Sequence, residues 1–408
     1  MKRWISAWMA LCMALLLCAA PGLAEQEAIF AGGAGTEAEP YRIETADQLL
    51  AFGQSVNDGS RGGYAGQYVQ LAADVDLAGV EWTPIGNMGD VEGFSTVFLG
   101  TFDGDGHTVS NLTFSTDEIT VGAGLFGISC GQIRHLTVEG ASVEVTEPAS
   151  QAIACVVGYN MGGVDDVHLK NSSATGNACV GGLVGGNMGA VSNCSVEDAV
   201  ITVLGDNDFS EGLVQCDIAE CGGLVIGGGF GGSIDGCTAS GTVRAEGNEP
   251  VGLGGIGGCL EMMDRIANCT ADVTITSAQG GHAIGGLCGY AGTHSNGSVA
   301  ADSEGIVTTQ YPGIIENCSV HVKIDAEGAT HVGGLVGTGL YYYGEETAFA
   351  VSNCKVTGEI NGAVTPGAVA GRAEGCAIEG CEVNVTVDGE TAGAEVGTTD
   401  RMYESADQ

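Results

Sequence analysis

GGLVGGNMGAVSNCSV, residues 181–196, joins a glycine-rich phrase to an asparagine and a cysteine, and the chain repeats this pattern along much of its length. Eight such phrases occur, with starts 27 to 48 residues apart, and each is followed by one slot that holds cysteine, leucine or valine. The phrases begin at Ala123, Ala154, Gly181, Gly222, Gly254, Gly285, Gly333 and Gly367. The slots are Leu136, Val167, Cys194, Cys237, Cys269, Cys318, Cys354 and Cys381. Self-similarity at this period predicts a solenoid, in which each unit buries its apolar face against its neighbours.

The repeated unit is built of strands rather than helices. Glycine is unfavourable inside helices, and the 71 glycines of the chain recur several times in each unit. In residues 271–277, Val273 and Ile275 share a face opposite Thr274 and Thr276, and this period of two is typical of a strand. Short strands joined by glycine corners, in coils stacked about 4.8 Å apart, predict an all-β parallel β-helix.

The slot cysteines are expected to point inward, because cysteine is a small apolar residue that fills a narrow core. Parallel Cβ vectors in stacked coils leave Cβ atoms about 4.8 Å apart, more than the ~4 Å that a disulfide needs, so free thiols are favoured in this column. A secreted protein folds in an oxidising compartment, however, and this favours disulfides over free thiols. Among the off-slot cysteines, Cys216 and Cys221 are the best placed to pair, and the pairing of the others stays open. These others are Cys130, Cys155, Cys179, Cys259, Cys288 and Cys376.

The pattern GGLVG-x-N-x-G-x-[VI]-x-N-C resembles the GLUG repeat of bacterial secreted and surface proteins, over roughly residues 123–390. FLGTFDGDGHTVSNLTF, residues 98–114, is similar to the segment that often precedes such repeats. The resemblance implies a right-handed parallel β-helix. Some members of the family are adhesins, and others are immunoglobulin-cleaving metallopeptidases that carry the repeat as an accessory. The chain contains no HExxH motif, so the peptidase part is not expected.

The first residues indicate export. Lys2 and Arg3 precede an apolar run that ends near Ala20, and small residues before position 25 predict a secretory signal peptide over residues 1–24. A membrane anchor or a lipoprotein site at Cys18 are the alternatives. No second apolar span follows, so we expect no transmembrane segment after signal removal and a secreted protein, either free or associated with the cell surface.

An amphipathic helix is predicted to cap the solenoid. Thr45-Ala-Asp-Gln48 is typical of a helix start, and Leu49, Phe52 and Val56 follow on one face. Residues 69–77 alternate as a strand. The expected organisation is a signal peptide (1–24), an N-terminal segment with the capping helix (25–60), the first coils (61–122), the GLUG-type repeats (123–390) and a polar tail (391–408).

The charge excludes some partners. With 12 Lys and Arg against 51 Asp and Glu, the chain carries a formal charge of −39, and loss of the signal peptide makes it two units more negative. We expect no binding to nucleic acid, which such a surface repels. No cofactor or metal is predicted as required. Calcium remains possible at Asp206, Asn207, Asp208 and Glu211, because calcium takes oxygen ligands.

Possible catalytic residues are sparse. Asp165 and Asp166 form the only Asp-Asp pair, with His168 and Lys170 close behind, and glycosidases need two carboxyl groups, one of which has a raised pKa. The neighbours of these residues read as an ordinary strand, so solvated charges are the simpler interpretation. His107, in Asp103-Gly-Asp-Gly-His107, is interpreted as part of a polar turn rather than a metal site. We therefore assign no catalytic residue, and an enzyme is the less favoured class.

Insertions give the stronger functional signal. Between phrase and slot, two adjacent repeats carry 29 and 17 residues where most others carry 9 to 11, so their loops should leave the same corner on neighbouring coils. These insertions hold Tyr290, His294, Tyr311, Tyr341, Tyr342 and Tyr343. Exposed tyrosines suit sugar stacking or protein contact. The alternative is that they pack on the solenoid wall.

These features predict a secreted or cell-surface, non-enzymatic, adhesin-like solenoid that binds a glycan or a cell-surface protein through its inserted loops. A β-helix polysaccharide lyase or glycoside hydrolase is one alternative, and a passive structural spacer is another. Part of this interpretation is analogy between folds.

Overall fold

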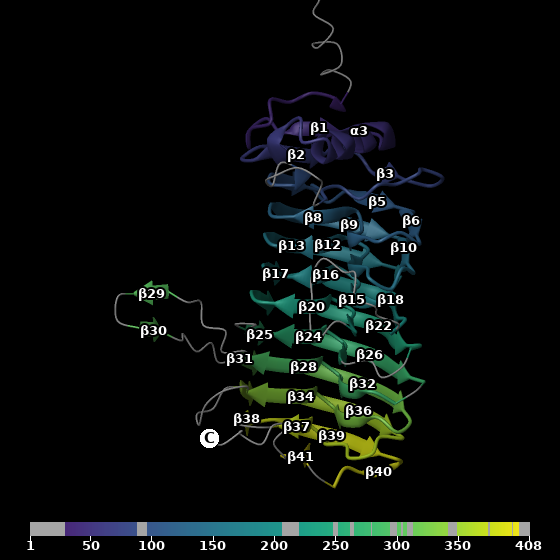
Figure 1. Cartoon of the computed structure of the whole chain (residues 1–408), viewed down its shortest axis with the longest axis vertical. Helices are drawn as coiled ribbons and strands as arrows, with labels where there is room; N and C mark the ends of the chain where they lie inside the picture. Colours follow the sequence, from purple (N-terminus) through teal and green to yellow (C-terminus); the bar gives the residue numbers. More distant parts are fainter. Residues whose placement is uncertain are drawn as a thin grey trace, which may run out of the picture.

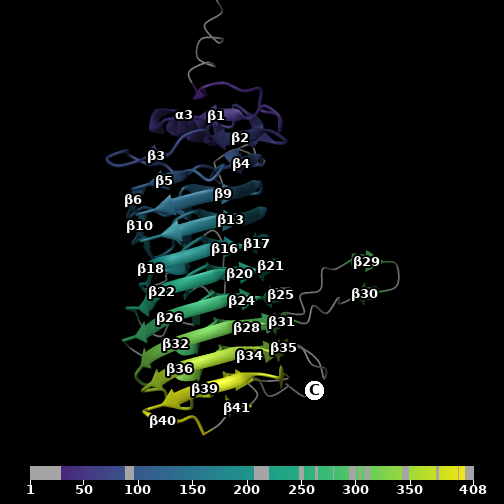
Figure 2. The same cartoon turned by 180° about the vertical axis from the view of Figure 1, so that it is seen from behind.

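The chain folds into an elongated stack of parallel coils, which confirms the predicted β-helix (Figure 1). The same order of coils, from the N-terminal helix to the last strands, is seen from behind in Figure 2. The computed structural model describes residues 29–87, 96–205, 220–247, 252–261, 265–278, 280–293, 300–302, 305–307, 313–341, 349–373, 376–393 and 395–399. The predicted signal peptide and most of the predicted tail lie outside these residues.

Three sheets make up the walls of the stack, here called sheets A, B and C. Sheet A contains β1 (Tyr41–Ile43), β2 (Tyr68–Leu71), β3 (Val75–Asp76), β4 (Thr101–Asp103), β5 (Thr108–Ser110), β6 (Thr113–Thr116), β9 (Gln132–Glu139), β10 (Ser142–Val145), β13 (Gly163–Lys170), β14 (Ser173–Gly176), β17 (Ala190–Ser192), β18 (Ser195–Val203), β21 (Ser233–Asp235), β22 (Thr238–Ala245), β25 (Arg265–Ala267), β26 (Thr270–Ser277), β31 (Gly313–Glu316), β32 (Ser319–Ala326), β35 (Phe349–Ser352), β36 (Lys355–Asn361), β38 (Cys376–Glu379), β39 (Glu382–Val387) and β40 (Glu390–Thr391).

Sheets B and C are formed by the two halves of the repeated phrase. Sheet C contains β7 (Val121–Ala123), β11 (Gln151–Ala154), β15 (Ala178–Gly181), β19 (Cys221–Gly223), β23 (Gly252–Gly254), β27 (His282–Gly285) and β33 (Thr330–Gly333). Sheet B contains β8 (Phe126–Ser129), β12 (Val157–Asn160), β16 (Val184–Asn187), β20 (Ile226–Phe230), β24 (Gly257–Glu261), β28 (Cys288–Thr293), β34 (Val336–Tyr341), β37 (Ala370–Ala373) and β41 (Val396–Thr398). One complete coil therefore runs through β15, β16, β17 and β18.

One glycine of each phrase lets sheets B and C touch backbone to backbone. A Cβ placed on Gly185 would lie 2.4 Å from the backbone carbon of Ala152, and one placed on Gly227 would lie 2.3 Å from that of Cys179. Real Cβ atoms essentially never come this close to backbone, so only glycine fits. The same close approach recurs at Gly158, Gly258, Gly289, Gly337 and Gly371.

The asparagine before the slot makes a bend in sheet A. Asn193, Asn268, Asn317 and Asn353 have φ between 51° and 55°, a left-handed conformation that asparagine tolerates better than most residues. Two of these side chains also bond to the preceding coil. Asn193 Nδ2 donates to Asp165 Oδ1 at 2.8 Å, and Asn268 Nδ2 donates to Asp235 Oδ1 at 2.7 Å. The asparagine therefore turns the chain and ties two coils together.

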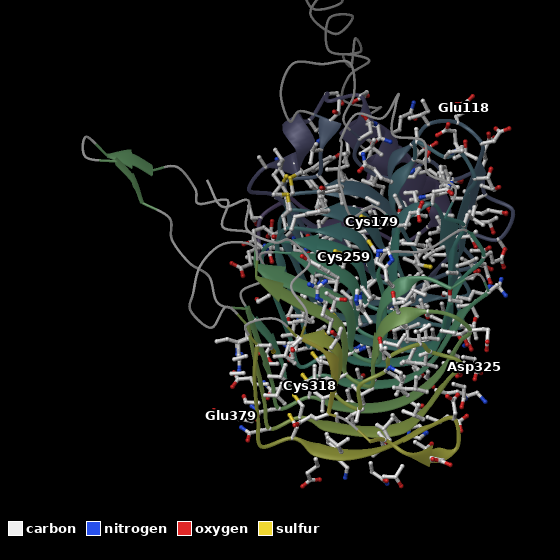
Figure 3. The ribbon with its side chains drawn as sticks, turned by 60° about the horizontal axis from the view of Figure 1, so that its bottom comes forward. Glu118, Cys179, Cys259, Cys318, Asp325 and Glu379 are labelled. Atoms are coloured by element: carbon white, nitrogen blue, oxygen red, sulfur yellow. The ribbon has the colours of Figure 1, made fainter. Side chains whose placement is uncertain are left out.

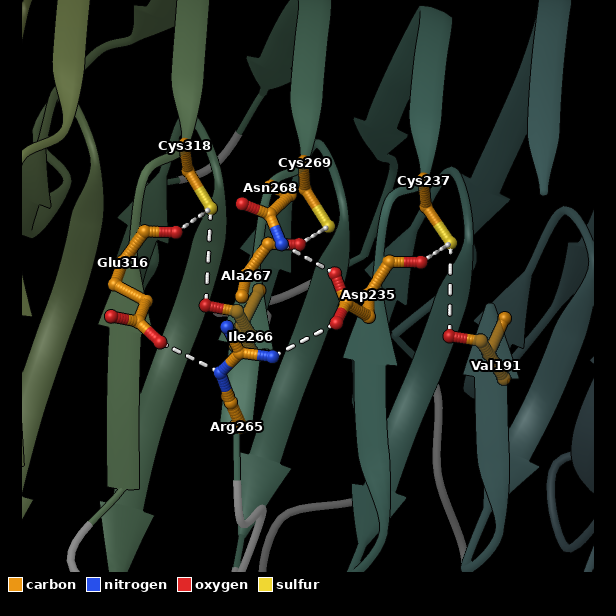
Figure 4. A network of polar contacts seen from close by, with 10 residues as sticks. All are labelled: Val191, Asp235, Cys237, Arg265, Ile266, Ala267, Asn268, Cys269, Glu316 and Cys318. Atoms are coloured by element: carbon orange, nitrogen blue, oxygen red, sulfur yellow. Dashed lines mark hydrogen bonds and ion pairs between the residues drawn. The ribbon is translucent and has the colours of Figure 1, made fainter. Parts of the chain in front are cut away.

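The slot residues occupy equivalent positions in successive coils. Val167 pairs with Leu136, and the flanking residues of every later slot pair in the same register. All but Cys381 are buried, and the slot cysteines are free thiols. Their thiols donate to backbone carbonyls at the bend, as Cys269 Sγ does to the Ala267 oxygen at 3.1 Å (Figure 4). Cys381 is partly exposed because, among the described strands, β39 has a parallel neighbour on one side only.

Strand pairing corrects the alignment of two phrases. Gly181 pairs with Gly223, so the fourth phrase starts at Gly223 rather than at Gly222. Ala123 pairs with Ile153, the residue before Ala154, so in sheet C the position equivalent to Ala154 is Gly124 rather than Ala123. Letter patterns could not resolve this, because consecutive glycines in GGLVIGG permit either alignment.

The predicted capping helix is confirmed as α3 (Ala46–Asn57). Thr45 Oγ1 accepts the Gln48 N–H at 3.3 Å, which satisfies one amide of the first turn, and Gln48 Oε1 accepts the N–H of Glu44, before the cap, at 2.7 Å. Leu49, Phe52 and Val56 are buried over the first coils. The short 3-10 helix η1 (Gly62–Tyr64) follows.

The single strand predicted over residues 69–77 is two strands, β2 and β3, separated by a corner at residues 72–74. Val69, Leu71, Val75 and Leu77 are all buried, so the alternation of residues was interpreted correctly. The corner could not be predicted from the sequence, because the alternation of apolar and polar residues continues through it.

Charge lies on the outside of the coils. Glu118, Asp325 and Glu379 project from the outer edge of the stack, whereas Cys179, Cys259 and Cys318 lie within it (Figure 3). Opposite charges on neighbouring coils form ladders, as where Lys323 Nζ lies 3.1 Å from Glu359 Oε1. Because such pairs are exposed, they add little to stability, and the packed interior holds the coils together.

Candidate functional site

The two long insertions leave from the corner where sheet B passes into sheet A. One runs from β28 to β31 and the other from β34 to β35. Since β28 pairs with β34 and β31 pairs with β35, the insertions have their bases on adjacent coils. The first insertion contains β29 (Ala300–Asp302) and β30 (Gly305–Val307), an antiparallel pair that stands away from the stack (Figures 1 and 2).

A network of ion pairs and hydrogen bonds lies beside this corner (Figure 4). Arg265, the first residue of β25, donates from Nε to Glu316 Oε1 at 2.7 Å and from Nη1 to Asp235 Oδ2 at 2.8 Å. Hydrogen bonding to Glu316, together with the charges of Glu316 and Asp235, raises the pKa of the Arg265 guanidinium. The network joins three successive coils and so holds together the strands next to this corner.

The structure corrects the placement of Tyr290. Its side chain is only 6% exposed and packs with Cys179, Cys221, Cys259 and Ala283, so it does not belong to an exposed binding surface. Tyr290 pairs with Cys259 and Thr338 in sheet B, and the cluster around its side chain includes Cys179, Cys221 and Ala283 of sheet C. The backbone of Tyr341 ends β34 and pairs with Thr293. His294, Tyr311, Tyr342 and Tyr343 lie outside the described residues.

The Asp165–Asp166 pair is occupied by structural contacts. Asp165 Oδ1 accepts the Ser192 hydroxyl at 2.6 Å and the Asn193 amide at 2.8 Å, and Asp166 occupies a left-handed bend with φ of 53°. The hydrogen bond from Ser192 is the main cause of a lowered pKa at Asp165. A general acid needs a raised pKa, so Asp165 is ionised at neutral pH and is unsuited to that role.

The nearby basic residues, His168 and Lys170, also contact polar side chains of the same or the next coil. His168 Nδ1 lies 2.7 Å from Ser195 Oγ, and His168 Nε2 lies 3.1 Å from Asp166 Oδ1. Lys170 Nζ lies 4.0 Å from Glu197 Oε2. Each group thus contacts a neighbour on its own coil or the next, which supports the interpretation of solvated, ladder-forming charges.

The pKa of Asp165 leads to a prediction about acid stability. A carboxyl whose pKa is lower in the folded than in the unfolded chain stabilises the fold above its unfolded pKa of about 4, and this contribution is lost as the pH falls through the folded value. We expect wild type to lose about 1 kcal/mol more than Asp165→Asn when the pH is lowered from 6 to 2, because the variant cannot ionise. Urea unfolding at a series of pH values measures the difference. Parallel pH profiles for the two proteins would contradict the assignment.

Metal sites find no support among the described residues. His107 Nδ1 lies 3.0 Å from Asp74 Oδ1 in an exposed turn, and no group of three or more potential metal-ligating side chains occurs in the part of the chain that the structure describes. The possible calcium ligands Asp206, Asn207, Asp208 and Glu211 lie outside that part, as does Cys216. Within the same ranges, no helix is long and apolar enough to cross a membrane.

The structure is a parallel β-helix built of repeats. Its coils pack closely through glycines, and its two long insertions leave from one corner. The model of the GLUG motif matches residues 176–202 and 328–361, so the chain carries this motif in at least two of its coils. The first match covers β15 to β18 and the second covers β33 to β36, so each spans one coil with its phrase, bend and slot.

Two relatives share parts of the chain. A Gly-rich membrane protein of Evansella cellulosilytica is 33% identical over 148 residues, which is 35% of this chain and 16% of that protein. Halomucin of Haloquadratum walsbyi is 32% identical over 164 residues, which is 38% of this chain and 2% of halomucin. The match thus spans only a small fraction of either relative.

A crystal structure from Bacteroides ovatus, assigned as an immunoglobulin A1 protease, resembles the chain with a TM-score of 0.52 and 23% identity. The resemblance covers 72% of this chain and 80% of that one. At this level of identity it supports the fold alone.

Proposed function

We propose that the chain is a secreted or surface β-helix protein that binds a glycan or another surface protein, without catalysis, through the loops at the corner between sheets B and A. The observation that carries the proposal is the β28–β31 insertion, whose β29–β30 pair projects from the stack (Figure 1). Loops held on a rigid scaffold are where proteins most often place binding residues. The names of the relatives, a membrane protein and a halomucin, agree with a location at the surface.

The scaffold favours binding over catalysis. The neighbouring coils support the bases of both insertions, and Arg265 links the strands beneath them to Asp235 and Glu316. The carboxylates considered for sugar hydrolysis are instead engaged with Ser192, Asn193 and His168. The excess of acidic residues argues against nucleic acid and anionic polymers as partners.

A loop-shortening experiment tests the proposal. We expect that replacing residues 294–312 with a short Gly-Ser turn lowers binding to a glycan array or to whole cells at least tenfold, since the projecting segment is lost. The matched control replaces residues 206–219, an insertion between β18 and β19 at a different corner, and should leave binding unchanged. Unchanged binding in both variants would eliminate the β28–β31 insertion as the site.

The same preparations distinguish the alternatives. Release of reducing or unsaturated sugars from polysaccharides, abolished by Asp165→Asn or Asp166→Asn, would establish the lyase or hydrolase instead. An array and a cell assay that are both blank for wild type would favour a passive spacer.

A further inference from the structure

A second buried cluster, separate from the main core, lies between sheets B and C. It contains Cys179, Cys221, Cys259, Ala283 and Tyr290, with Phe230 packed against it. Cys179 and Cys259 are seen deep within the stack in Figure 3. Cys179 lies on β15 and Cys221 is the first residue of β19, in the next coil.

The Cys179 and Cys221 sulfur atoms are in contact, with a distance of 3.7 Å between the Sγ atoms. The residues stand at equivalent positions, because the following residues Val180 and Gly222 pair directly. Stacked residues in parallel strands normally have parallel Cβ vectors, which keep their Cβ atoms about 4.8 Å apart. Cys179 has φ of +51°, whereas Cys221 does not have a positive φ, so their Cβ vectors are not parallel and the sulfurs can approach.

The opposite sheet leaves room for this sulfur pair. Gly228 on β20 faces it, and a Cβ on that residue would lie 2.6 Å from Cys179 Sγ and 3.3 Å from Cys221 Sγ. Other thiols also have carbonyl partners, and the thiols of the slot column interact with one another as well. Cys155 Sγ donates to the Ser173 carbonyl at 3.4 Å, and Cys194 Sγ donates to the Ser192 carbonyl at 3.0 Å.

We propose that Cys179 and Cys221 form a disulfide between neighbouring coils when the chain folds in an oxidising compartment. Cys221 directly follows the insertion between β18 and β19, so the bond would fix the point at which the chain returns to the stack. The favoured partner of Cys221 is therefore Cys179 in the coil before it, and not Cys216 in the insertion.

The chemistry needs a thiol oxidant such as oxidised glutathione. The Cys221 thiolate attacks one sulfur of glutathione disulfide, forms a mixed disulfide and releases one glutathione thiolate. The Cys179 thiolate then attacks the Cys221 sulfur of the mixed disulfide, which forms the Cys179–Cys221 bond and releases the second glutathione. Two protons and two electrons leave the cysteine pair, and one glutathione disulfide is reduced to two thiols. Because both thiols are buried in the finished fold, the reaction takes place as the coils dock.

Peptide mapping tests the proposal directly. The full chain is folded with oxidised glutathione or with a reductant, blocked with iodoacetamide in denaturant, and cleaved at acidic residues without reduction. This cleavage matters because trypsin would leave residues 171–244 as one peptide, whereas Asp217 and Glu220 separate Cys216 from Cys221. We expect a linked peptide that joins Cys221 to the segment with Cys179, and fragmentation distinguishes Cys179 from Cys194 within that segment.

Variants provide the second measurement. Oxidised wild type should melt a few degrees above the reduced protein, and Cys179→Ala or Cys221→Ala should remove both the link and this difference. Cys155→Ala, a matched buried thiol that donates to a carbonyl, should retain both. A link from Cys221 to Cys216 or Cys259, or complete alkylation of Cys179 and Cys221 in the oxidised wild type, would overturn the proposal. These measurements need no ligand, so they remain valid whether or not the loops bind one.

Discussion

Gly185→Ala is expected to destabilise the stack by about 3 kcal/mol or more, although it adds a single methyl group. The added Cβ would lie 2.4 Å from the backbone carbon of Ala152 and 2.5 Å from the Ile153 nitrogen. Both atoms belong to the backbone of β11, so no side chain can rotate away, and sheets B and C must separate locally. The midpoint of urea unfolding, followed by circular dichroism, measures the loss.

Gly393→Ala is the matched control for this change. No atom lies within 4 Å of a Cβ added at Gly393, and this glycine does not have a positive φ. Its substitution should therefore change the midpoint by less than about 0.5 kcal/mol. If Gly185→Ala unfolds with the same midpoint as Gly393→Ala, the backbone contact between sheets B and C is not what the repeated glycine provides.

The role of this glycine could not be predicted from the sequence, unlike most of the fold. The period, the strands and the slot column are all visible in the sequence, because alternation and repetition are local patterns. We assigned the phrase glycines to corners, yet Gly185 and Gly227 lie on strands without a positive φ, and they are small because another coil's backbone passes over them. Such a contact joins residues that are far apart in the sequence, Gly185 with Ala152 and Gly227 with Cys179, so no local pattern reports it.

The candidate site was predictable in its location but not in its residues. The lengths between phrase and slot placed both insertions at one corner, and pairing of β28 with β34 agrees with this. Tyr290 was grouped with the loops because it lies close to them in sequence. Its actual environment depends on neighbouring coils, because it pairs with Cys259 and Thr338 and packs against side chains of sheet C. The contact between Cys179 and Cys221 could not be predicted from the sequence either, because it depends on the left-handed φ of Cys179.

The second large effect is expected at the N-terminal cap, where Phe52 of α3 is fully buried. Its ring lies 5.1 Å from that of Tyr64, 5.9 Å from Phe98 and 6.0 Å from Phe102, measured between centroids. Phe52→Ala leaves a cavity against three aromatic rings and should cost about 3–5 kcal/mol. Gln54→Ala, on the exposed face of the same helix, should be close to neutral.

Where the Phe52→Ala variant loses protection shows whether Phe52 seals the end of the stack or stabilises the whole stack as an ordinary core residue would. In a stack where each coil contacts only its neighbours, a loosened end should fray without melting the distant coils. Hydrogen exchange should therefore speed up in β1, β2 and β4 of Phe52→Ala, whereas β26 and β32 keep their protection. Faster exchange spread evenly over all coils would mean that the stack unfolds as one unit, and α3 would then stabilise the whole solenoid rather than seal its first coils.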